Sequence, residues 1–171
     1  TCAIDVLVKV LEDTNQETIV RHEAAEALGA ICEEKSEDIL RKYLSDPNVE
    51  LRETCQLALD MIHWKHTSAS GKIEDNNIYN TVDPAPAMIT KDVAELRQTL
   101  LNSDITLFNR YRAMFTLRNI KSKESVAALC EALKHGSALF KHEIAFVLGQ
   151  LQDVDSVPHL IETLRDLEEN E

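Results

Sequence analysis

The chain has 171 residues, of which 44% are hydrophobic but only 5% aromatic, and it contains four glycines and four prolines. This length can bury one sizeable core or two small ones, and so few aromatic and turn-forming residues favour packed helices over a β-sandwich. The formal net charge of −12 argues against nucleic acid as a partner and fits a cationic one, while the lack of an apolar run of about 18 residues argues against a membrane helix.

Amphipathic helices are predicted at intervals from the first residues to the last. Their apolar residues recur at i, i+3, i+4 and i+7, the spacing that lines one face of a helix. We expect each helix to bury this face against its neighbours. Three segments follow the spacing closely and two follow it more loosely: Ile4-Leu7-Val8-Leu11, Val126-Leu129-Cys130-Leu133 and Val157-Leu160-Ile161-Leu164, then Ile39-Leu40-Tyr43-Leu44 and Val93-Leu96-Leu100.

A second set of helices lies between these stripes at a fixed offset along the chain. Leu28 and Leu59 are 31 residues apart, and so are Leu117 and Leu148. A period of about 30 residues with two helices in each unit is typical of a solenoid of helical hairpins. Such hairpins stack to bury their apolar faces, and their second helices line the concave side.

Residues 67–90 interrupt this pattern. Thr67-Ser68-Ala69-Ser70-Gly71 consists of small residues, and Asp83-Pro84-Ala85-Pro86 cannot continue a helix. We therefore predict an N-terminal helical-repeat lobe over residues 1–66, a linker over 67–90 and a C-terminal helical-repeat lobe over 91–171.

The four cysteines, Cys2, Cys32, Cys55 and Cys130, show no CxxC pair and no regular spacing. Each lies in an apolar helical pattern, where a free thiol packs as a small hydrophobic group. We expect them to be reduced and structural, which favours a cytoplasmic protein.

One local pattern occurs twice, as RHEAAEALGAI from Arg21 and as KHEIAFVLGQL from Lys141. Each copy places a histidine and a glutamate side by side, His22-Glu23 and His142-Glu143, with Leu-Gly following. Imidazole and carboxylate together suit iron, manganese or zinc. Neither copy has the second histidine of HExxH, so the zinc-protease interpretation fails.

A surface or helix-capping pair is the alternative interpretation of each His-Glu copy. Two copies in matching repeat positions favour a site instead. Gly29 and Gly149 each cost a helix about 1 kcal/mol, which a close helix contact would explain. Glu26 lies on the face of His22 and could accept a hydrogen bond from a metal ligand or contact a cationic substrate, although a solvated side chain is the simpler expectation. His63 and His66 are expected to be solvated at a helix end.

These motifs resemble the deoxyhypusine hydroxylase family over nearly the whole chain. RHEAAEALGAI and FKHEIAFVLGQLQ are similar to two of that family's four His-Glu motifs, and SDPNVELRETCQLALD, VDPAP, LFNRYRAMFTLRN and GSALFKHE are similar to its intervening segments. The resemblance implies an all-α fold, with HEAT-like helical-hairpin repeats (an α-solenoid) in two lobes around a di-iron centre.

The resemblance also implies the activity of an iron-dependent monooxygenase. Such an enzyme uses dioxygen as co-substrate to hydroxylate deoxyhypusine, a modified lysine on a eukaryotic translation factor, and so completes hypusine. His22 and Glu23 are implied to bind one Fe²⁺ and His142 the second. Glu143 is implied to be either a further metal ligand or a catalytic carboxylate beside the oxygen site.

The first and fourth His-Glu motifs are missing from the sequence. One step of 31 residues before His22 or after His142 falls outside residues 1–171. We therefore expect the central part of a longer enzyme, inactive alone, whose exposed repeat ends could drive self-association. Two other hypotheses remain: a metal-free repeat scaffold that binds a protein segment in its groove, and a chromophore-attaching lyase with similar repeats.

Overall fold

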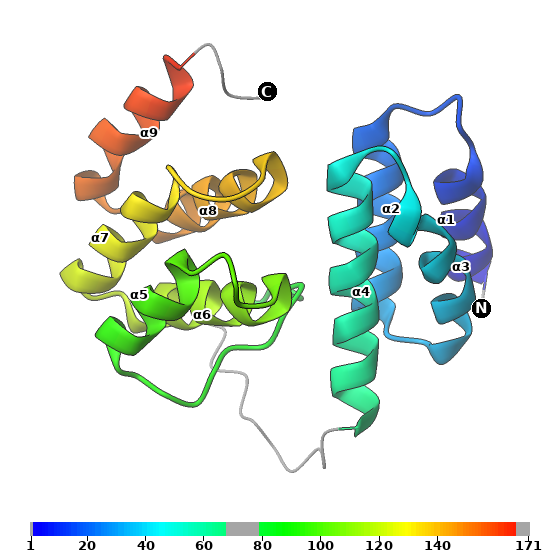
Figure 1. The fold of residues 1–171 in the computed structure, drawn as a ribbon, viewed down its shortest axis with the longest axis horizontal. Coiled ribbons are helices and arrows are strands. Elements are labelled where there is room, and N and C mark those ends of the chain that lie inside the picture. The colour runs from blue at the N-terminus through cyan, green and yellow to red at the C-terminus, as the bar shows by residue number, and fades with distance from the viewer. Residues whose placement is uncertain (1, 68–78, 167–171) are drawn as a thin grey trace. The chain divides into compact units, whose positions relative to one another are not determined.

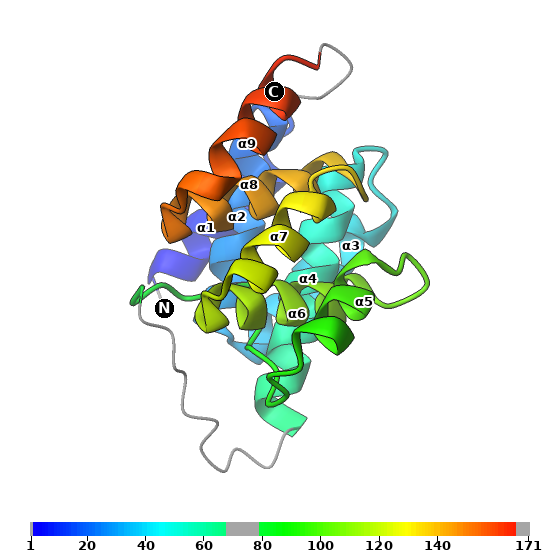
Figure 2. The same cartoon turned by 90° about the vertical axis from the view of Figure 1, so that its left-hand side faces the viewer.

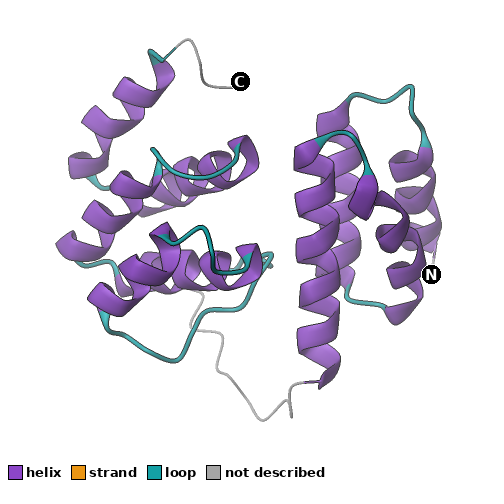
Figure 3. Ribbon diagram, in the orientation of Figure 1, coloured by secondary structure: helices purple, strands orange, loops and turns teal. Residues whose placement is uncertain are grey.

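The computed structural model describes residues 2–67 and 79–166. Every regular element in these two ranges is a helix, which confirms the predicted all-α fold (Figures 1 and 3). The described chain divides into two compact units: residues 2–67 with 82–84 form the first, and residues 79–81 with 85–166 form the second. Part of the predicted linker, residues 68–78, lies outside the described residues.

The first unit contains two helical hairpins in sequence. Its elements are α1 (Cys2–Glu12), α2 (Thr18–Ile31), the 3-10 turn η1 (Glu34–Ser36), α3 (Glu37–Lys42), the 3-10 turn η2 (Tyr43–Ser45) and α4 (Val49–Thr67). Helix α2 packs against α1 on one side and α4 on the other. The second helices of consecutive hairpins are therefore neighbours, as a solenoid requires.

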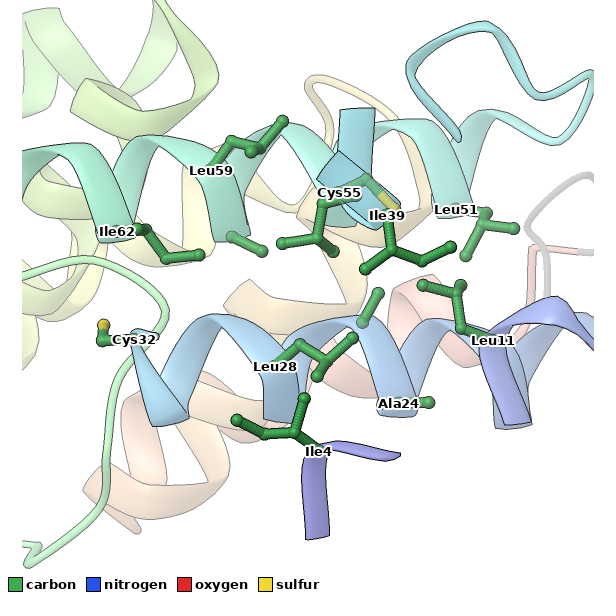
Figure 4. Close-up of a cluster of buried hydrophobic side chains, with 13 residues drawn as sticks. Ile4, Leu11, Ala24, Leu28, Cys32, Ile39, Leu51, Cys55, Leu59 and Ile62 are labelled. Carbon is green, nitrogen blue, oxygen red and sulfur yellow. The ribbon is translucent and has the colours of Figure 1, made fainter. Parts of the chain in front are cut away.

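The core of the first unit lies between α1, α2 and α4 (Figure 4). Ile4 and Leu11, from the first predicted stripe, belong to this buried cluster together with Leu28 of α2 and with Leu51 and Cys55 of α4. The other two members of that stripe are partly buried against the same cluster. The helical spacing thus identified the buried face of α1 correctly.

Helices α2 and α4 approach each other closely at Gly29. A Cβ atom built on Gly29 would lie 2.8 Å from the Cβ of Ala58 and 2.9 Å from its Cα, so the space for a side chain is filled. This contact confirms the predicted reason for Gly29. The same prediction is wrong for Gly149, where a Cβ would meet nothing within 4 Å. The difference arises because no second helix of a later hairpin follows α8 in the described chain.

The second unit repeats the hairpin pattern. Its elements are α5 (Val93–Leu101), α6 (Leu107–Ile120), α7 (Lys123–Ala132), α8 (Ala138–Leu151), the 3-10 turn η3 (Val154–Ser156) and α9 (Val157–Leu164). Within this unit α5, α7 and α9 follow one another in an outer layer, with α6 and α8 as the second layer (Figures 1 and 2). Asp92, Thr106, Ser122 and Ser137 begin four of these helices, because each side chain accepts a hydrogen bond from an amide of the first turn.

A buried arginine fixes the hairpin geometry in both units. The Arg21 Nε donates to the Leu11 carbonyl and the Arg110 Nε to the Leu100 carbonyl, each at 2.9 Å and each spanning ten residues of the chain. Both guanidinium groups also lie over an aromatic ring of the following hairpin, with 5.4 Å from Arg21 Cζ to the ring centroid of Tyr43. The corresponding distance to the ring of Phe140 is 4.0 Å for Arg110.

The later part of the predicted linker packs along α6. The Pro86 carbonyl accepts a hydrogen bond from Arg112 Nε at 3.1 Å, and the Met88 amide donates to Thr116 Oγ1 at 2.7 Å. Ala85 is fully buried. Residues 85–88 therefore follow the surface of α6 rather than running free.

Helix α9 departs from the prediction. Val157, Ile161 and Leu164 are all exposed, and the helix buries none of its residues. The predicted burial of this stripe is therefore wrong for the described residues, because no later helix in that range covers it. None of the helices in residues 2–67 and 79–166 is long and apolar enough to cross a bilayer.

Candidate metal-binding residues

His22 lies in the second turn of α2, directly after the buried arginine that ties this helix to α1. Only 4% of His22 is exposed. Its Nδ1 is 2.7 Å from Thr54 Oγ1 on α4, and its Nε2 is 3.5 Å from Glu23 Oε1. The Glu23 side chain is 65% exposed. The two ring nitrogens thus face different surroundings, a buried hydroxyl on one side and a solvent-accessible carboxylate on the other.

The His22-Glu23 pair fits one edge of a metal site. Two donor atoms that each lie about 2.1 Å from one ion are about 3.0 Å apart at an octahedral angle and about 3.4 Å apart at a tetrahedral one, so the observed 3.5 Å between Nε2 and Oε1 is slightly wider than either spacing and closer to the tetrahedral one. Imidazole and carboxylate donors suit iron and leave positions open for other ligands. Among the described residues, no group of three or more histidine, cysteine, aspartate and glutamate side chains is gathered around one point. The described residues of the first unit therefore offer two potential donors at this position rather than a full set.

Glu26 lies on the same face of α2 and is half-buried rather than solvated as expected. Burial raises the pKa of this carboxyl, and the negative charge of Glu23 raises it further. A carboxylate held in this way would be stabilised by any cation that approaches the His22-Glu23 pair.

The second copy of the motif shows the opposite exposure. His142 is exposed on α8, whereas only 9% of Glu143 is exposed. Helix α2 packs against α4, which follows it in the chain, and on this side His22 is covered. Helix α8 packs against α6 and α7, which precede it, and on that side Glu143 is covered instead. The motif is the same in sequence, but the neighbouring helix that is present differs.

His66 and the cysteines, which were also considered from the sequence, contact other groups of the fold rather than a His-Glu pair. His66 is exposed, yet its Nε2 lies 3.1 Å from the Cys32 carbonyl at the end of α2, and its Nδ1 lies 3.5 Å from Glu34. Three cysteines are buried free thiols, as predicted: Cys32, Cys55 and Cys130. The side chain of Cys2 is not among those that the structure describes. Burial, and to a smaller extent Asp46, raises the pKa of Cys55 to about 12. Burial also raises the pKa of Cys32 and of Cys130, so all three thiols stay protonated at neutral pH.

Thr54 is the residue of this site that the sequence reasoning missed. It is 3% exposed and makes a direct contact with the His22 ring. The one available signal was the 31-residue period, which places Thr54 one repeat after Glu23 on the adjacent second helix.

The sequence is similar to known proteins over almost its whole length. The family model for HEAT repeats matches residues 2–67 and 93–170. Deoxyhypusine hydroxylase from Drosophila pseudoobscura pseudoobscura is 53% identical over 170 residues, which are 99% of this chain and 56% of the relative. The enzyme of the same name from Homo sapiens is 49% identical over 168 residues, covering 98% of this chain and 55% of the relative.

A solved structure shows the same likeness. The structure of human deoxyhypusine hydroxylase in complex with glycerol superposes with a TM-score of 0.93 at 48% identity. The match covers 99% of this chain and 58% of that structure's chain. The chain thus spans little more than half the length of the relatives that it matches.

Proposed function

The chain belongs to the HEAT-repeat family and is a homologue of deoxyhypusine hydroxylase, and from this premise we propose that it forms the central, metal-binding part of such an enzyme. The proposed reaction is the dioxygen-dependent hydroxylation of the deoxyhypusine side chain on a eukaryotic translation factor. The observation that carries the proposal is the pair of His-Glu motifs, in a chain about half identical to these relatives over almost all of its length.

We assign the metal ligands by motif. His22 and Glu23 would hold one Fe²⁺, and His142 would hold the second, with Glu143 as a further ligand or as a carboxylate beside the oxygen site. Iron would supply the activation of dioxygen that hydroxylation of an unactivated C–H bond requires and that no side chain provides.

The residues of the chain would bind and orient the metal and the cationic side chain of the substrate. Burial fixes the His22 ring in one position, while the exposed Glu23 carboxylate can turn toward an ion at little cost. The net charge of −12 favours the approach of a cationic, polyamine-like side chain. The half-buried Glu26 adds to this negative potential next to the His22-Glu23 pair.

The chain contains two of the four His-Glu motifs that the resemblance implies. We therefore propose that it binds iron weakly and does not hydroxylate substrate on its own. Full turnover by the isolated 171-residue chain would contradict this part of the proposal.

A metal-free scaffold that binds a protein segment is the second candidate. The observation that favours it is the match to HEAT repeats over residues 2–67 and 93–170, because stacked helical repeats form extended concave surfaces that bind other proteins. Under this hypothesis, replacing the histidines would leave partner binding unchanged.

Substitutions in a protein extended to the full length of its relatives separate the two candidates. His22→Ala and His142→Ala should each reduce the iron content and abolish hydroxylation of a deoxyhypusine-containing protein substrate. His63→Ala changes an exposed histidine of α4 outside both motifs and serves as the matched control. Retention of iron and activity in both motif variants would rule out the assigned ligands, whereas absence of iron and activity from the unsubstituted full-length protein would favour the scaffold.

A further inference from the structure

We propose that Thr54 is a positioning residue for His22: its hydroxyl oxygen accepts a hydrogen bond from the protonated Nδ1, which leaves Nε2 to bind a metal. The assignment of Nδ1 depends on geometry alone, whereas its consequence for metal binding rests on the proposed function. Thr54 does not touch the metal in this scheme and acts only through the histidine ring.

The hydroxyl group of Thr54 has a single hydrogen and two neighbours that could receive it. The Glu50 carbonyl, four residues earlier on α4, lies 2.9 Å from Oγ1, and His22 Nδ1 lies 2.7 Å from it. If the hydrogen is donated to Glu50, the short contact with His22 must be a hydrogen bond that Thr54 accepts. In that case Nδ1 carries the proton.

Thr116 on α6 shows that this arrangement occurs in the same fold. Its hydroxyl donates to the carbonyl of Arg112, again four residues earlier, at 2.6 Å and accepts a hydrogen bond from the Met88 amide at 2.7 Å. An amide N–H can only donate, so the direction of both bonds is fixed. His22 Nδ1 occupies at Thr54 the place that the Met88 amide occupies at Thr116.

Two further threonines follow the same rule. Thr67 donates to the His63 carbonyl at 2.6 Å, and Thr163 donates to the His159 carbonyl at 3.1 Å. A threonine in a helix of this chain thus repeatedly gives its hydrogen to the carbonyl one turn earlier.

The consequence concerns the second ring nitrogen. A neutral histidine that is protonated at Nδ1 carries its lone pair on Nε2, the atom 3.5 Å from Glu23 Oε1. A lone pair beside a carboxylate is the arrangement that a cation stabilises. Histidine ligands commonly have their other ring nitrogen held by a hydrogen-bond acceptor, which sets both the tautomer and the ring orientation. The close contact of α2 with α4 at Gly29 keeps Thr54 within reach of the ring.

Nitrogen NMR of the 171-residue chain tests the assignment without metal. Long-range proton–nitrogen spectra in alkaline solution distinguish the two neutral tautomers, and loss of one ring signal in His22→Gln identifies His22. We expect the Nδ1–H tautomer in the unchanged protein. Thr54→Val should shift the ring toward the Nε2–H tautomer, Thr54→Ser should retain Nδ1–H, and Thr116→Val should leave His22 unchanged.

Two results would overturn the inference. One is an Nε2–H tautomer of His22 in the unchanged protein, a result that needs no folded variant. The other is a Thr54→Val protein whose His22 remains in the Nδ1–H form.

A separate readout keeps the proposed function distinguishable. In the full-length protein Mn²⁺, used as an air-stable probe for Fe²⁺, should bind about tenfold more weakly or worse after Thr54→Val, and Thr54→Ser should restore binding. Equal Mn²⁺ affinity in the Thr54→Val and unchanged proteins would refute the positioning role. If the full-length protein has the Nδ1–H ring but binds no Mn²⁺, the proposed function is contradicted, while the hydrogen bond from His22 Nδ1 to Thr54 stands.

Discussion

Replacing Gly29 by alanine tests how closely α2 and α4 are packed. Alanine gains about 1 kcal/mol over glycine in a helix interior, but the added methyl group would lie 2.8 Å from the Ala58 Cβ and 2.9 Å from its Cα. Overpacking costs about 1–3 kcal/mol. The Cα belongs to the backbone and can move only if α4 shifts, so the cost should lie near the upper end of this range. We expect Gly29→Ala to destabilise the protein by about 1–2 kcal/mol.

Gly149→Ala is the matched control, because a Cβ at that position meets nothing within 4 Å. It should stabilise the protein by about 0.5–1 kcal/mol through helix propensity alone. Urea denaturation followed by far-ultraviolet circular dichroism measures both changes. If Gly29→Ala stabilised the protein as much as Gly149→Ala, the close contact between α2 and α4 would be refuted.

Three further predictions concern stability and association. Arg110→Ala should lower the free energy of unfolding by about 2–3 kcal/mol in denaturant titrations, because it leaves the buried Leu100 carbonyl without its partner; a loss below the error of the titration would contradict this role. Burial raises the pKa of Cys55 from 9.0 to about 12, so between these pH values the thiol ionises in the unfolded chain but not in the folded one. Its contribution to the free energy of unfolding is therefore full below pH 9 and is lost as the pH rises toward 12. Cys55→Ala should therefore flatten the decline of unfolding free energy with alkaline pH, and an unchanged decline would refute this. The apolar stripe of α9, with Leu164 85% exposed, should cause association of the chain at high concentration, and Leu164→Ser with Ile161→Ser should reduce it in sedimentation experiments; equal association in the double variant would argue against this surface.

Periodicity alone identified the helices and their pairing into hairpins. The stripe from Ile4 to Leu11 and the offset of 31 residues between Leu28 and Leu59 depend on local spacing, which a sequence displays directly. Gly29 was also interpretable, because a glycine inside a helix has a cost that calls for a reason.

The exposure of individual motif residues could not be predicted in this way. His22 and His142 occupy the same place in their motifs, yet one is buried and the other exposed, because burial depends on which neighbouring helix covers that face. Gly149 and the α9 stripe failed as predictions for the same reason. Thr54 was missed because its contact with His22 joins two helices, and its hydroxyl gives no sign in the sequence of which group it meets.

Iron content per chain tests most directly the central proposal, that the His22-Glu23 and His142-Glu143 motifs bind iron. We would measure iron and the absorption spectrum in air for the 171-residue chain and for a protein extended to the full length of its relatives. The account predicts two irons per chain and a coloured species that depends on oxygen in the extended protein, with little iron in the shorter chain. Absence of iron from both proteins would contradict it and leave the His-Glu pairs as structural elements of a helical-repeat scaffold.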